Sequence, residues 1–157
     1  MKPKLYLETT VPSYLTAWPS RDLIRAKHQR MTLDWWCNRR EEFDLFISQL
    51  VLDEASDGDQ QAAHERLLAL KGIPLPDLTV EVAELAEDLK VSLALPARAA
   101  ADAAHIAVAA VHGMHFLLTW NCTHIANAER FVTIDTVCRR QGFAGPVICT
   151  PEEIVRR

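Results

Sequence analysis

The sequence has little of what marks several common classes of protein. It carries only 5 glycines in 157 residues, and neither a Gly-x-Gly-x-x-Gly nor a Gly-x-x-x-x-Gly-Lys pattern occurs. Dinucleotide-binding and P-loop enzymes are therefore disfavoured. The Gly-x-Ser-x-Gly elbow of α/β-hydrolases is missing as well. No apolar run is long enough for a signal peptide or a membrane span, so we expect a cytoplasmic protein without membrane contact.

The cysteines are scattered and lack the spacing of a metal site. The four residues Cys37, Cys122, Cys138 and Cys149 form no Cys-x-x-Cys pair and have no His-x₃-His partner nearby. Because structural zinc needs closely spaced ligand pairs, the sequence disfavours zinc. It indicates instead free thiols, buried or partly buried, in a reducing compartment.

The net charge is −4, which argues against a protein that coats nucleic acid by charge alone. It does not exclude a nuclease whose carboxylates hold divalent ions, because bound metal neutralises those charges. Basic residues are nevertheless grouped, most clearly at Arg21, Arg25, Lys27 and Arg30. The simplest interpretation of this group is a solvated helix face.

Short apolar runs alternate with helical patterns along the chain. Strands are predicted at residues 4–7, 43–47, 115–119 and 147–149, with a proline-broken edge strand at 73–78. The Thr-Thr-Val-Pro segment at 9–12 predicts a turn. Helices are predicted at residues 20–40, 48–54, 60–70, 79–89, 97–112 and 127–141, the first of them capped by Ser20.

These strands are continuous apolar runs, which is typical of a parallel sheet covered on both faces. We therefore predict an α/β fold, one three-layer domain over residues 1–157 with a parallel sheet of four to five strands and helices on both faces. In such sheets ligands bind at the carboxyl ends of the strands. Residues that follow each strand are thus the candidates for function.

Four polar residues are expected to meet at this edge. Glu8 follows the first strand, Asn121 follows the third, and Glu54 lies on the helix after the second. Asp102 stands among alanines in the first turns of an apolar helix. Burying it unpaired would cost several kcal/mol, so it needs a metal, donors, or Arg98 one turn earlier as its partner.

Oxygen ligands without a cluster of Cys or His suit Mg²⁺ or Mn²⁺, and such ions serve phosphodiester hydrolysis. The two histidines near these acids receive no catalytic role. We expect His105 to be a core residue or to hydrogen-bond a ligand from behind, and His124 to cap a short turn.

Four stretches carry a further signal: Leu-Tyr-Leu-Glu-Thr-Thr-Val at 5–11, Ser-Gln-Leu-Val-Leu-Asp-Glu at 48–54, Ala-Asp-Ala-Ala-His-Ile-Ala-Val-Ala at 101–109, and Leu-Leu-Thr-Trp-Asn at 117–121. In this order they resemble the PIN-domain family, and within it the VapC-like toxins of type II toxin–antitoxin systems. The resemblance covers nearly the whole chain. It implies a metal-dependent endoribonuclease that uses Mg²⁺ or Mn²⁺, cuts RNA, is inhibited by a cognate antitoxin protein and often forms a homodimer.

By motif position, the resemblance implies that Glu8, Glu54 and Asp102 ligate the metal and that Thr9 lies beside it. Two departures stand out: Glu8 replaces the family's usual Asp, and Asn121 replaces a fourth acid, so that it orients water or ligates weakly. Asn121 also supports an alternative, a catalytically weak PIN-like module that binds RNA or a protein without cutting. A receiver-type domain would need two adjacent early acids and a Lys after a late strand, and neither is evident.

Overall fold

A four-stranded sheet and seven α-helices form the described part of the chain, residues 1–154 of a computed structural model. The strands are β1 (Lys4–Leu7), β2 (Asp44–Phe46), β3 (Phe116–Leu118) and β4 (Val147–Cys149). The helices are α1 (Thr10–Thr16), α2 (Leu23–Asn38), α3 (Gln49–Ala55), α4 (Gln60–Leu70), α5 (Val80–Ser92), α6 (Ala100–Val111) and α7 (Ala128–Arg140), with short 3₁₀ turns at Arg40–Glu42 and Ala97–Ala99.

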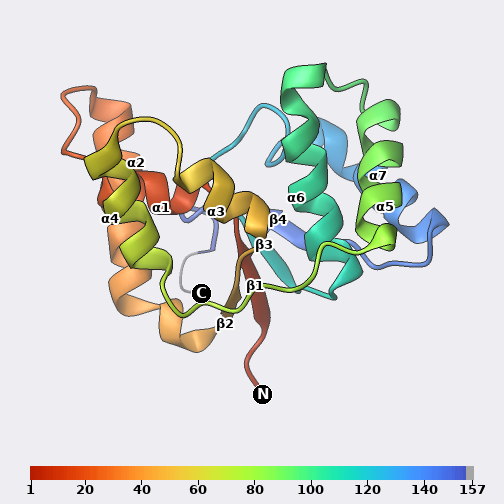
Figure 1. Ribbon diagram of the computed structural model, residues 1–157, viewed down its shortest axis with the longest axis horizontal. Coiled ribbons are helices and arrows are strands. Elements are labelled where there is room, and N and C mark those ends of the chain that lie inside the picture. The colour runs from red at the N-terminus through yellow and green to blue at the C-terminus, as the bar shows by residue number, and fades with distance from the viewer. Residues whose placement is uncertain (155–157) are drawn as a thin grey trace.

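All strand pairs are parallel, and the strand order is β2-β1-β3-β4. Helices α1, α2 and α4 lie on one side of the sheet, and α5, α6 and α7 lie on the other (Figure 1). Because both faces are covered, side chains of both orientations along β1 are buried: Leu5, Tyr6 and Leu7 are each 0% exposed. The predicted three-layer α/β fold with a parallel sheet is confirmed.

The strand order also places a switch point beside β1. From β1 the chain passes to β2 on one side, and it later returns to pair β3 with β1 on the other side. Such a reversal opens a crevice at the carboxyl ends of the two central strands, where ligands of open α/β sheets bind. The backbone N–H of Glu8 donates to the carbonyl of Leu118 at 3.1 Å, so Glu8 and Thr119 leave the sheet side by side.

Two predicted elements are wrong. Residues 9–12 do not form a turn, because α1 begins at Thr10 and accommodates Pro12 in its first turn, where no intrahelical N–H bond is lost. Residues 73–78 form no strand, although the carbonyl of Pro74 accepts from the N–H of Ile47 at 3.1 Å. Both errors lie in proline-containing segments.

Smaller details also differ from the sequence interpretation. The cap of α2 is Asp22, whose carboxylate accepts from the Arg25 N–H, and not Ser20. The four cysteines are free, but Cys37 and Cys122 are exposed, so the expected burial is found only for Cys138 and Cys149.

Within the described residues, no helix combines the length and apolar character needed to cross a membrane.

Candidate metal centre

Glu8 begins the site, directly after β1. Its side chain is almost fully buried, since the residue is 4% exposed. Oε1 accepts from the Thr10 N–H at 3.1 Å, from the Thr10 hydroxyl at 2.5 Å and from the Thr119 hydroxyl at 2.7 Å. These three bonds all end on Oε1 and fix the orientation of the carboxylate. Among the described residues no hydrogen bond to Oε2 is formed, so Oε2 is available to a further ligand.

Glu54 comes to the same place from α3. Its Oε1 accepts from the Thr9 hydroxyl at 2.5 Å and lies 2.7 Å from Nε2 of His105. Burial alone raises the pKa of this carboxyl, but the hydrogen bond and charge of His105, together with the Thr9 hydroxyl, lower it more. The net pKa of Glu54 lies below its ordinary 4.5, so the group is ionised at neutral pH.

His105 on α6 connects this carboxylate to the core. The ring is 0% exposed, and Nδ1 lies 2.7 Å from the Tyr6 hydroxyl, which in turn lies 2.7 Å from the Ser48 hydroxyl. Burial raises the pKa of Tyr6, so its hydroxyl stays neutral and can both donate and accept. Because an ionised carboxylate only accepts, Nε2 carries the proton that is shared with Glu54.

The charges around His105 also affect its protonation. Burial alone lowers the pKa of the imidazole, whereas the hydrogen bond to Glu54 and the negative charges of Glu8, Glu54 and Asp102 raise it. The net pKa of His105 is raised, which is the shift expected for a buried ring facing several carboxylates.

Glu8, Glu54 and His105 together form a group able to hold a metal ion. One potential ligand atom from each lies within 4.8 Å of the other two. His105 can ligate only through a nitrogen that has lost its proton, and Nε2 is committed to Glu54. Of these three residues, the two carboxylates are therefore the better suited to ligate a metal, and His105 is placed to orient Glu54.

Asp102 and Asn121 stand at the margin of this group. Asp102 is one helical turn before His105 on α6. Its Oδ2 lies 2.9 Å from Nδ1 of His124, and this histidine, not Arg98, is its partner within the described contacts. The amide oxygen of Asn121 accepts from the His124 N–H at 3.0 Å and so holds the turn that presents the imidazole.

The sequence interpretation thus anticipated only part of the site. Glu8 and Glu54 are brought together, and Asp102 belongs to the same electrostatic environment, but it is not in the group within 4.8 Å. His124 does not cap the turn; Asn121 does. His105 is fully buried in the core, as one of its two expected places required, and it hydrogen-bonds Glu54.

The hydroxyls of Thr10 and Thr119 were not anticipated from the sequence, whereas Thr9, which the resemblance placed beside the metal, donates to Glu54. Thr10 and Thr119 both donate to Glu8, and Thr10 also accepts from the Trp120 N–H at 2.8 Å. A hydroxyl that follows a strand is too common to predict such a role. Only the pairing of β1 with β3 brings residues 10 and 119 together.

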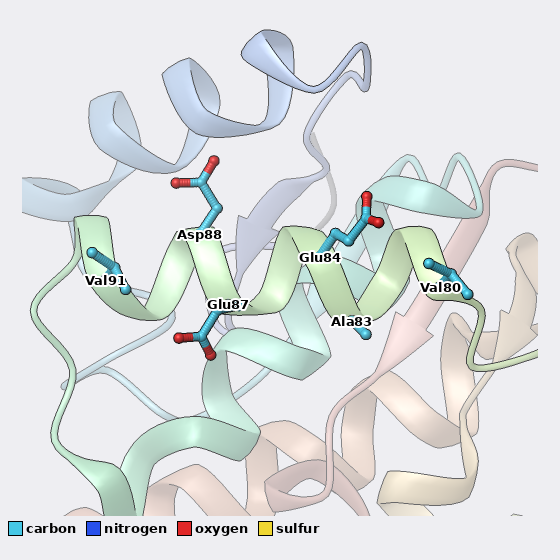
Figure 2. A pocket seen from close by; sticks show the side chains of 6 residues that line it. All are labelled: Val80, Ala83, Glu84, Glu87, Asp88 and Val91. Atoms are coloured by element: carbon cyan, nitrogen blue, oxygen red, sulfur yellow. The ribbon is translucent and has the colours of Figure 1, made fainter.

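A surface hollow elsewhere contains no comparable chemistry. A space of about 600 Å³ lies along α5 and is lined by Val80, Ala83, Glu84, Glu87, Asp88 and Val91 (Figure 2). Asp88 points toward α7, where it pairs with Arg140 at 2.8 Å, and Glu87 points away from it (Figure 2). None of these residues belongs to the acidic group, which we define as Glu8 and Glu54 with His105 beside them.

Comparison of the chain with protein-family models, with curated protein sequences and with solved structures finds no match in any of the three.

The Glu54–His105 pair predicts a pH dependence of stability in the metal-free protein. A lowered carboxyl pKa gives stability that is complete above 4.5 and is lost as the pH falls through the folded-state value. A raised imidazole pKa gives stability that is complete below 6.5 and is lost as the pH rises through the folded-state value. The pair therefore contributes most between pH 4.5 and 6.5.

Melting curves in EDTA test this window. The difference in Tm between wild type and Glu54→Gln should be largest inside it and should shrink on both sides. A difference that stays constant from about pH 3 to 9 would show that the two groups are not coupled.

Proposed function

We propose that this chain is a metal-dependent endoribonuclease, the toxin of a toxin–antitoxin pair. The observation that carries the proposal is the approach of two carboxylates, Glu8 and Glu54, at the switch point of a parallel sheet. No Lys or Arg is paired with either of them in the described part of the chain. Carboxylates this close repel each other, and a divalent cation relieves the repulsion.

The donors fit Mg²⁺ or Mn²⁺. Carboxylate and hydroxyl oxygens are hard ligands, and none of the cysteines lies in the group. When bound, such an ion polarises the scissile phosphate, makes water more acidic and neutralises the leaving oxygen. Glu8 and Glu54 would hold it, with Asp102 completing the set from α6.

The surrounding side chains fix these carboxylates in advance. The hydroxyls of Thr10 and Thr119 hold one oxygen of Glu8, and Thr9 and His105 hold one oxygen of Glu54. Fixed orientation lowers the cost of assembling the site when substrate arrives. The neutral Asn121 adds no charge; it holds the turn that brings His124 to Asp102.

A second candidate function has one observation in its favour. Asp102 Oδ2 pairs with the ring of His124 and the amide oxygen of Asn121 accepts from its backbone N–H, so each side chain has only its other polar atom left for a ligand. A module that binds RNA or a protein without cutting would tolerate this. Incubation of purified protein with single-stranded RNA in Mn²⁺, with EDTA as the control, separates the two. Metal-dependent fragments support the enzyme, and intact RNA that remains bound supports the module.

The toxin assignment makes its own prediction. Induction of the wild-type chain alone in a bacterial host should slow growth by cutting RNA in the cytoplasm, and Glu54→Gln at matched expression should not. Co-expression of a cognate antitoxin, expected to bind the toxin homodimer, should restore growth. Equal inhibition by wild type and Glu54→Gln would contradict toxicity through this site.

A further inference from the structure

The turn between α1 and α2 presents an aromatic ring to solvent. Trp18 is 91% exposed, although an indole in water leaves a large apolar surface uncovered. The backbone beneath it is nevertheless fixed, because Gln29 on α2 donates to the Trp18 carbonyl at 3.0 Å and accepts from the Ser20 N–H at 2.9 Å. An exposed ring on a pinned backbone is arranged for contact with something outside the molecule.

Exposed arginines follow Trp18 in the sequence and on α2. Arg21, Arg25 and Arg30 are exposed, and no carboxylate lies within ion-pair distance of any of them among the described residues. The nearest acid in sequence, Asp22, uses its carboxylate to accept from the Arg25 N–H at the start of α2. The segment is thus locally basic on a chain whose net charge is −4.

A series of packed rings connects this segment to the acidic group. The Arg25 guanidinium lies 5.9 Å from the Tyr14 ring, and Tyr14 lies 5.9 Å from Trp120. The backbone N–H of Trp120 donates to the Thr10 hydroxyl, which itself donates to Glu8. Helix α1 leads from the end of β1 to the α1–α2 turn and spans only about 10 Å over its 7 residues (Figure 1).

We propose that Trp18, Arg21 and Arg25 form a binding surface for single-stranded RNA that leads to the acidic group. This rests on the proposed function and names the class of substrate. The Trp18 indole stacks on one base, and the two guanidinium groups contact the phosphates that follow it. A base inside a duplex has both faces covered, so a lone exposed indole selects an unpaired strand.

The test is fluorescence anisotropy of a labelled single-stranded oligoribonucleotide, and of the same sequence as a duplex, in EDTA so that nothing is cut. Trp18→Ala should bind the single strand about tenfold more weakly, the loss of one base stack. Trp18→Phe keeps a stacking face and should retain most of the affinity. A plot of the logarithm of the binding constant against the logarithm of the salt concentration has a negative slope. Arg21→Ala and Arg25→Ala should each make this slope shallower by about 0.7.

Matched controls come from α7, on the other side of the sheet. Val132 is 77% exposed and Arg139 is an exposed cation, so Val132→Ala and Arg139→Ala should bind within twofold of wild type. Unchanged affinity of Trp18→Ala, or no RNA binding by wild type, would overturn the inference. If Trp18→Ala lost as much affinity for the duplex as for the single strand, the surface would not select single-stranded RNA.

Leu23 and Ile24, which follow Trp18 in the sequence, are also exposed. The alternative to RNA is therefore that a protein binds this surface. If Trp18→Ala abolishes self-association in sedimentation velocity but leaves RNA affinity intact, the surface joins two copies and the inference is wrong. Failure of the proposed function looks different: wild type then cuts no RNA in Mn²⁺, whatever the anisotropy of Trp18→Ala shows.

Discussion

Glu54→Gln is expected to lower Mn²⁺-dependent RNA cleavage by at least about 100-fold, since even residues that only orient a metal ligand are worth 10- to 100-fold. The amide keeps the size of the side chain but removes the charge that faces Glu8. Asp102→Asn is expected to have the same effect, because the proposal has Asp102 complete the ligand set. Cleavage of a labelled RNA under single-turnover conditions measures both losses.

A neighbouring residue provides the control. Asp53, the preceding residue on α3, is exposed and accepts from the side chain of Gln49 at 2.9 Å, outside the acidic group. Asp53→Asn should therefore cleave at the wild-type rate. If Glu54→Gln cleaved as fast as Asp53→Asn, Glu54 would have no part in the reaction.

His105→Ala should destabilise the metal-free protein by about 3–5 kcal/mol, one of the larger costs of a single substitution. Loss of the ring leaves a cavity beside α6 and removes the partner of both the Glu54 carboxylate and the Tyr6 hydroxyl. Buried polar groups without partners carry their full desolvation penalty. Urea unfolding in EDTA measures the free energy of unfolding.

The matched control is His64→Ala on α4. His64 is an exposed histidine in the middle of a helix, so its replacement should change the free energy of unfolding by about 0.5 kcal/mol or less. A His105→Ala variant as stable as His64→Ala would mean that the contacts of His105 with Glu54 and Tyr6 contribute nothing to stability.

The fold was predictable because its strongest signals are local. Each strand is a short continuous apolar run, and the predicted and observed bounds coincide for β1 and β4. Helix ends were also readable where a glycine with positive φ follows, as Gly72 does after α4 with φ of +84°. The helix α1 was missed because Thr-Thr-Val-Pro has the composition of a turn, whereas proline is also tolerated in a first helical turn.

The site was predictable in outline and not in its contacts. Acids that follow parallel strands must come to one edge of the sheet, which is why Glu8 and Glu54 could be paired from sequence. Whether Asp102 binds Arg98 or another partner depends on the course of the chain after β3, and no local pattern shows that His124 returns to α6. The hydrogen bonds of His105 likewise join β1, α3 and α6, residues up to 99 positions apart.

Calorimetric titration of the metal-free protein with Mn²⁺ tests most directly whether the carboxylates form a metal centre. Wild type should bind one Mn²⁺ ion tightly, Asp53→Asn should match it, and Glu54→Gln should bind at least about tenfold more weakly because one facing charge is lost. Equal affinity of wild type and Glu54→Gln, or no heat of binding from wild type, would contradict a metal centre at Glu8 and Glu54.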